Sequence, residues 1–194
     1  GADLLLFMRA GSRHAELAWQ ASYCFRPRRY FGSREKPAGV FYLFRDTPDR
    51  RGMVKQILDG GETGLNGDQL FGFERLLRNG VSADCNLRLP RATSVGETVH
   101  GWVERFYAPR TGIGLGDVCS VRAHLDQMNR ARVVLATTDQ LGLPAAREKA
   151  EGRLKTPLIY VSIGLPERLM AVELKSPARA ARYRKRLSAA ARFV

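Results

Sequence analysis

Few residues of this sequence combine the types and the spacing that chemistry needs. Its three histidines and three cysteines show no metal-ligand spacing and no Cys-x-x-Cys motif, so we expect no metal site. His124 and Asp126 form a candidate acid–base pair near the end of a predicted strand, although such a histidine is more often a packing residue. Gly112, Gly114 and Gly116 lack the Lys-Ser/Thr of a phosphate-binding loop and predict a hairpin turn. We also expect no cofactor.

Basic residues are the second group of interest, and they gather near the two ends of the chain. The 194 residues carry a net charge of +13. Residues 175–194 hold seven Lys and Arg and no acid, and residues 26–36 hold five against one Glu. Such segregation indicates arms that bind another protein subunit, RNA or anionic lipid, with solubility alone as the alternative. The predicted partner-binding residues are Arg28, Arg29, Arg179, Arg182, Arg184, Lys185 and Arg186.

Composition bounds the class of protein and its location. The chain is 44% hydrophobic and 26% charged, which is typical of a globular domain with extensions. No apolar run approaches the roughly 18 residues that a membrane span needs. The odd number of cysteines argues against a disulfide framework. The Arg-rich N-terminal region and the string Arg-Arg-Tyr-Phe-Gly-Ser at 28–33 resemble a mitochondrial processing site, which predicts a protein of the matrix or the inner membrane.

The elements that must position these residues follow from the apolar pattern. We expect a helix at 3–24, a strand at 39–44, and helices from about 52 and from 70 to 77. Period-two alternation and turn residues then predict strands at 81–89, 98–106, 118–125 and 132–138. A further strand at 158–163 and a final basic helix at 177–191 complete the chain. Consecutive strands joined by tight turns predict an antiparallel sheet with a helix on its buried face, an α+β arrangement.

Two stretches of this pattern carry a family resemblance. The sequence Gly-Val-Ser-Ala-Asp-Cys-Asn-Leu-Arg-Leu-Pro at 80–90, followed by Val-Gly-Glu-Thr-Val-His-Gly-Trp-Val at 95–103, resembles the hotdog-fold acyl-CoA thioesterases of the phenylacetyl-CoA thioesterase type. The resemblance implies a hotdog domain at 39–143, an antiparallel sheet wrapped around a central helix, which can form a hotdog dimer. Residues 1–38 are then a helical extension with a basic linker, and residues 144–194 are a C-terminal extension ending in a basic helix.

The resemblance also implies a catalytic site on the helix at 52–59. The family has a His-Gly-Gly motif at the helix start, where backbone N–H groups stabilise the thioester oxyanion, and a helical Asp as general base or nucleophile. By position these roles fall on Gly52 and Asp59, with Arg50 and Arg51 in place of the His and the first Gly. The Cβ of Arg51 obstructs close approach of a substrate. The alternative interpretation of Asp59 is a C-terminal helix residue before a glycine break.

Two functional hypotheses follow from these observations. The first is a non-catalytic, thioesterase-like pseudoenzyme that serves as a structural subunit of a large mitochondrial assembly, a respiratory complex or a mitoribosome. The second is an active acyl-CoA thioesterase whose basic residues hold the phosphates of CoA. The replacement at 50–51 and the segregated charge favour the first hypothesis. We further expect the helix at 177–191 to be an anchoring arm, because it offers little apolar surface for docking on its own domain.

Overall fold

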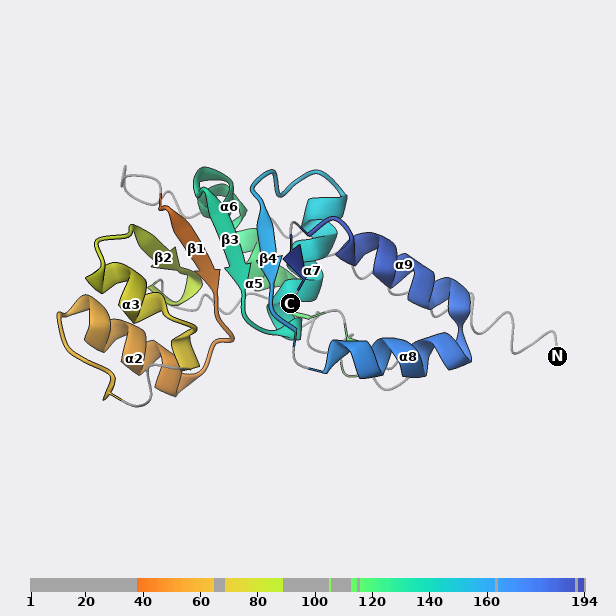
Figure 1. The fold of residues 1–194 in the computed structure, drawn as a ribbon, viewed down its shortest axis with the longest axis horizontal. Helices are drawn as coiled ribbons and strands as arrows, with labels where there is room; N and C mark the ends of the chain where they lie inside the picture. Colours follow the sequence, from red (N-terminus) through yellow and green to blue (C-terminus); the bar gives the residue numbers. More distant parts are fainter. Residues whose placement is uncertain are drawn as a thin grey trace.

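Four consecutive apolar residues at 40–43 form β1, an inner strand of the sheet in the computed structural model (Figure 1). Three of the four are buried, which is typical of a strand covered on both faces. This strand pairs in parallel with a neighbour on each side, and the whole five-stranded sheet is parallel, in the order β2-β1-β3-β4-β5. The strands are β1 (Val40–Leu43), β2 (Ala83–Cys85), β3 (Val133–Ala136), β4 (Leu158–Tyr160) and β5 (Arg192–Phe193).

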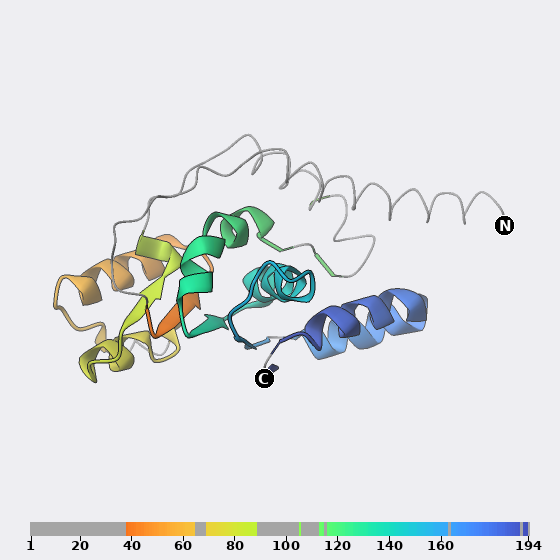
Figure 2. The same cartoon turned by 90° about the horizontal axis from the view of Figure 1, so that it is seen from above.

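Helices connect the strands and cover both faces of the sheet (Figure 2). The structure describes residues 38–64, 69–88, 105, 113–114, 116–162, 164–190 and 192–193. The α-helices of these residues are α2 (Pro48–Leu58), α3 (Phe73–Arg78), α5 (Val118–Ala123), α6 (Leu125–Arg130), α7 (Asp139–Ala150), α8 (Leu165–Lys175) and α9 (Pro177–Leu187), and Asn86–Arg88 form the 3-10 helix η2.

Alternate residues of β1 point into two separate hydrophobic cores. Phe41 and Leu43 belong to the core that α5, α6 and α7 cover. Tyr42 and Phe44 belong to the core under α2 and α3, where their rings pack against Phe73 at centroid distances of 5.3 and 5.8 Å. The chain therefore leaves β1 toward one face of the sheet and leaves β3 toward the other. This is a doubly wound α/β arrangement.

The expected hotdog fold is wrong, because the sheet is parallel. The predicted strand at 118–125 is helical, since Asp117 accepts a hydrogen bond from the backbone N–H of Ser120 and starts α5. Among the described residues of the predicted strand 81–89, Ala83–Cys85 form β2 and Asn86–Arg88 form η2 instead of continuing the strand. The segment 132–138 does contain a strand, but it runs parallel to β1. The predicted strand 98–106 lies outside the described residues except for residue 105.

The C-terminal residues are part of the same sheet and core. Helix α7 crosses residue 143, where we expected the domain to end, and β4 pairs with β3. The prediction that the final helix has too little apolar surface to dock on its own domain is also wrong. Ala180, Tyr183 and Leu187 of α9 are buried in the core that contains α7. Tyr183 supplies the apolar area that the sequence argument left out.

Candidate functional site

The topology singles out one place on the molecule, the carboxyl end of β1 and β3. Helix α2 follows β1 on one face of the sheet, and α7 follows β3 on the opposite face. Where two neighbouring strands send their connections to opposite faces, the loops diverge and leave a crevice. In open α/β sheets ligands bind in this crevice. The side chains at the ends of these two strands are therefore the first candidates for function.

Side-chain hydrogen bonds hold the loop after β1 in place. The side chain of Asn86, which is buried, accepts from the backbone N–H of Phe44 at 2.8 Å and donates to the Phe44 carbonyl at 3.0 Å. Arg51 forms a two-pronged ion pair with Asp46, with N···O distances of 2.6 and 2.8 Å, and donates to the Leu87 carbonyl at 3.1 Å. These bonds tie the end of β1 to the segment after β2. The loop is thus preorganised.

The loop after β3 is tied to β1 in the same way. Both the backbone N–H and the hydroxyl of Thr137 donate to the Leu43 carbonyl, at 3.2 and 3.0 Å. Thr138, the next residue, is the N-cap of α7 but makes no side-chain cap hydrogen bond. Its hydroxyl is enclosed and has no hydrogen-bond partner among the described residues. Thr138 therefore keeps an unused donor and acceptor beside the crevice.

Two arginines lie in the segment that follows β1. Arg45 is exposed, and Arg50, in the first turn of α2, is partly buried. Neither side chain makes an ion pair with another described residue. Burial and the nearby positive charge of Arg45 both lower the pKa of Arg50. The pair therefore concentrates positive charge at the N-terminus of α2, where the helix dipole also favours an anion.

The loop after β4 has a closed polar network instead. The buried carboxylate of Asp139 accepts from the Tyr160 hydroxyl at 2.7 Å, from the Ser162 hydroxyl at 2.8 Å and from Arg168 Nη2 at 2.5 Å. Burial and the neighbouring Asp139 raise the pKa of Tyr160. These bonds join β4 and α8 to the start of α7, so we assign this network a role in positioning.

Cys85 and His124 are buried residues of types that often take part in catalysis, but their surroundings do not favour reactivity. Burial raises the pKa of the Cys85 thiol to about 12, so it is not a thiolate nucleophile at neutral pH. His124 donates from Nδ1 to the Ser120 carbonyl at 2.8 Å, and burial lowers its pKa. Asp126, its expected acid–base partner, is exposed on α6. Among the residues that the structure describes, no group of His, Cys, Asp and Glu is placed to hold a metal ion.

Of the residues predicted as catalytic from the sequence, Asp59 lies away from the carboxyl end of β1 and Gly52 lies near it. Gly52 is exposed on α2, and Asp59 is exposed at the opposite, C-terminal end of that helix. The predicted partner-binding residues 179–186 lie on α9, where Arg184 pairs with Glu173 of α8. Arg28 and Arg29 lie outside the described residues. Sequence reasoning noticed Arg50 only as a departure from a motif and did not single out Arg45.

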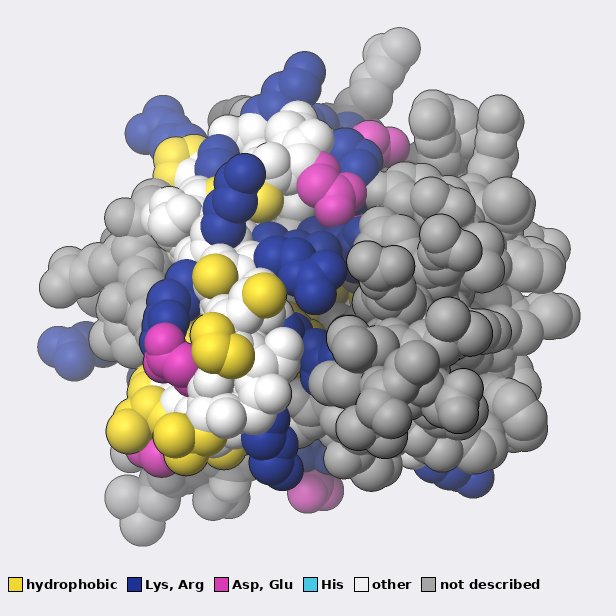
Figure 3. All heavy atoms as spheres, turned by 90° about the vertical axis from the view of Figure 1, so that its right-hand side faces the viewer, with side chains coloured by type: hydrophobic (Ala, Val, Ile, Leu, Met, Phe, Trp, Pro, Cys, Tyr) yellow, Lys and Arg dark blue, Asp and Glu magenta, His cyan; other side chains and the backbone are white. Residues whose placement is uncertain are grey.

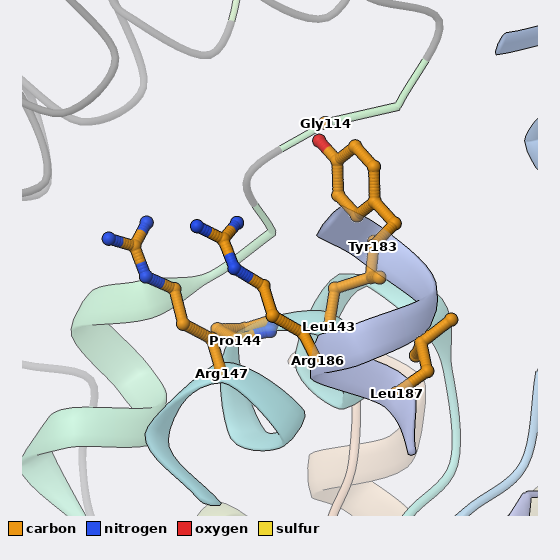
Figure 4. A pocket seen from close by; sticks show the side chains of 7 residues that line it. All are labelled: Gly114, Leu143, Pro144, Arg147, Tyr183, Arg186 and Leu187. Atoms are coloured by element: carbon orange, nitrogen blue, oxygen red, sulfur yellow. The ribbon is translucent and has the colours of Figure 1, made fainter. Parts of the chain in front are cut away.

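A second polar place is a pocket between α7 and α9 (Figure 4). Arg147 of α7 and Arg186 of α9 extend side by side along it, and the Tyr183 ring stands at its edge. Arg147 is buried and donates to Glu151 at 2.7 Å, which neutralises its charge within its own helix. We interpret this pocket as part of the packing of α9 on α7.

Comparisons with known proteins assign no family to the chain. No family model matches the sequence, and no curated protein and no solved structure matches it. The described helices include none that is long and apolar enough to cross a bilayer.

Proposed function

We propose that this chain is an α/β domain that binds a phosphate-bearing small molecule, of the size of a nucleotide or a sugar phosphate, at the carboxyl end of β1 and β3. One observation carries the proposal. Arg45 and Arg50 both follow β1 at the topological switch point, the charge of Arg45 acts on Arg50, and neither has an ion-pair partner among the described residues. Two guanidinium groups held near one another repel, and a bound anion removes that repulsion.

The surroundings of the two arginines support an anion with several oxygen atoms. Thr47 caps the first turn of α2 by accepting a hydrogen bond from the Arg50 backbone N–H. A ligand at this helix end would then be bound by the positive end of the helix dipole and by the two guanidinium groups. Asp46 is engaged by Arg51, which leaves Asp49 as the other carboxylate of the segment. Residues 45–51 therefore carry three positive and two negative side chains. Arginine recognises phosphate through paired, charge-assisted hydrogen bonds.

Preorganisation is the second support for a binding role. The bonds of Asn86 to Phe44 and of Thr137 to Leu43 fix the loops before any ligand arrives. A site whose loops are already ordered loses less conformational entropy on binding.

The test is a binding measurement with matched variants. Isothermal titration with nucleoside diphosphates, glucose 1-phosphate and coenzyme A, each at constant ionic strength, gives the affinity of the wild-type protein. A charge-assisted hydrogen bond contributes about 1.5–3 kcal/mol, so Arg50→Gln is expected to weaken binding roughly ten- to hundredfold. Arg132→Gln, an exposed arginine at the amino end of β3, serves as the control and is expected to leave the affinity unchanged.

Equal losses in the Arg50 and Arg132 variants would contradict the proposal, because a general charge effect would then explain binding. Coenzyme A is included because it bears phosphates, and the same titration therefore also tests whether the chain binds the coenzyme of a thioesterase substrate. The thioesterase hypothesis stays a prediction, although the parallel sheet does not provide the hotdog setting in which Gly52 and Asp59 would act. The role of a structural subunit in a mitochondrial assembly also stays a prediction.

A further inference from the structure

Helices α8 and α9 form a hairpin that extends beyond the end of the sheet (Figures 1 and 2). Leu169 and Val172 of α8 face α9 and the rest of the core, together with Ala180 and Tyr183 of α9. The outward side of α8 is different. It carries two large apolar residues one turn apart, Met170 at 65% and Leu174 at 91% exposure. Leu174 lies next to the turn that joins the two helices.

Basic side chains surround this apolar tip. Residues 164–190 hold seven Lys and Arg against two Glu, a net charge of +5. Of the two acids, Glu173 is paired with Arg184, and this pairing lowers the pKa of Glu173. Glu167 lies in the first turn of α8, at the end of the hairpin away from the tip. Arg184 therefore neutralises the Glu173 charge beside the tip, and Lys175, Arg179 and Arg182 leave a net positive charge there.

Figure 3 looks onto this end of the molecule and shows hydrophobic side chains next to Lys and Arg and a few Asp and Glu side chains on one surface. Met170 and Leu174 are the most exposed of the large hydrophobic residues that the structure describes, and they lie on one helix face. Apolar side chains within a basic surround are typical of helices that lie in the headgroup region of an anionic bilayer. An acidic protein face would match the same charge, and the flotation experiment below distinguishes it from a bilayer.

We infer that the α8–α9 hairpin is a membrane-binding element, which inserts Leu174 and Met170 among the headgroups of an anionic bilayer while Lys175, Arg179 and Arg182 contact lipid phosphates. This surface is separate from the crevice at β1 and β3 and does not depend on the ligand proposed there. The protein then binds to the membrane surface through the hairpin. A basic side chain near an anionic leaflet strengthens binding roughly fivefold, and the effect falls off within about 10 Å at ordinary salt.

The experiment is vesicle flotation of the full chain with phosphatidylcholine vesicles that contain or lack phosphatidylglycerol. The wild type is expected to float with the anionic vesicles only. The variant Lys175→Gln/Arg179→Gln/Arg182→Gln is expected to lose about a hundredfold in partitioning. The variant Met170→Ser/Leu174→Ser tests the apolar tip at unchanged charge, and it is also expected to lose binding. A control with the same charge change elsewhere, Lys55→Gln/Arg130→Gln/Arg132→Gln, is expected to bind within a few-fold of the wild type.

Because every substituted residue of the tip variants is exposed or partly exposed, circular dichroism is expected to show native folding in all of them. Equal losses in the hairpin and control charge variants would overturn the inference, since binding would then follow net charge alone. Unchanged flotation of the Met170/Leu174 variant would also overturn it. Binding of the wild type to an oligonucleotide but not to anionic vesicles would reassign the surface to nucleic acid.

Discussion

Substitution of Asn86 tests the connection that holds the proposed crevice together. In Asn86→Ala, the backbone N–H and the carbonyl of Phe44 both lose their partner. Phe44 has no exposed surface, so water does not replace the missing amide. A buried polar group left without a hydrogen bond costs about 1–3 kcal/mol, and the variant leaves two. We therefore expect a loss of roughly 2–6 kcal/mol in the free energy of unfolding, a large part of the 5–15 kcal/mol typical of a domain.

The assay is equilibrium unfolding in urea, followed by circular dichroism. The midpoint of Asn86→Ala is expected to fall, and the slope against urea concentration is expected to stay the same, because the surface exposed on unfolding does not change. Asn79→Ala is the matched control. Asn79 is an exposed residue at the C-terminal end of α3, so this change is expected to cost less than about 0.5 kcal/mol. A loss below about 1 kcal/mol for Asn86→Ala would refute the reasoning, since the loop after β1 would then not depend on this side chain.

Two further predictions concern buried charge and pH. Glu148 is fully buried and pairs with Arg122 at 2.9 Å and with Arg153, so Glu148→Gln is expected to cost roughly 3–5 kcal/mol in urea unfolding, against less than about 1 kcal/mol for the more exposed Glu151→Gln. A small loss for Glu148→Gln would show that the two arginines do not depend on it. Burial lowers the pKa of His124 below 6.5, so protonation of this side chain favours the unfolded chain. The contribution of neutral His124 to the free energy of unfolding is therefore complete above about pH 6.5 and decreases as the pH falls below that value. Unfolding measured from about pH 7 to pH 5 is expected to show a smaller decrease in His124→Gln than in the wild type, and equal decreases would contradict this assignment.

Local pattern predicted several elements of the fold. The helix expected from about residue 52 is α2, which begins earlier because Thr47 caps it and Pro48 occupies its first turn. The expected strands at 39–44, 132–138 and 158–163 contain β1, β3 and β4. The final helix begins at Pro177, as the proline predicted. These elements depend on caps and on runs of apolar residues, which the sequence shows directly.

The direction and order of the strands could not be predicted in the same way. Alternation of Cys119, Val121 and Ala123 fits a strand, but Val118 and Val121 are also one helical turn apart, and both are buried against the core in α5. If residues 118–125 were a strand, no helix would connect β2 to β3. Strands joined by short turns can pair only antiparallel, which is why the sequence predicted an antiparallel sheet. A helical segment there permits the parallel arrangement.

The candidate site depended on the same choice. Arg45 and Arg50 become candidate ligand-binding residues only when β1 and β3 are known to be parallel neighbours whose connections lie on opposite faces of the sheet. In the sequence they are two of many arginines, and the attention given to Asp59 came from a resemblance to another fold. Thr138 gives no signal at all until its hydroxyl is seen to lack a partner among the described residues.

The most direct test of the account is to map where a phosphate-bearing ligand binds. Backbone amide NMR shifts recorded during titration with nucleoside diphosphates and glucose 1-phosphate report the contacted residues one by one. We predict that the largest shifts fall at residues 45–51 and 137–139, at the carboxyl end of β1 and β3. Shifts confined to the amino end of the sheet at 131–133 and 155–157, or no shifts with any of these ligands, would contradict the central claim.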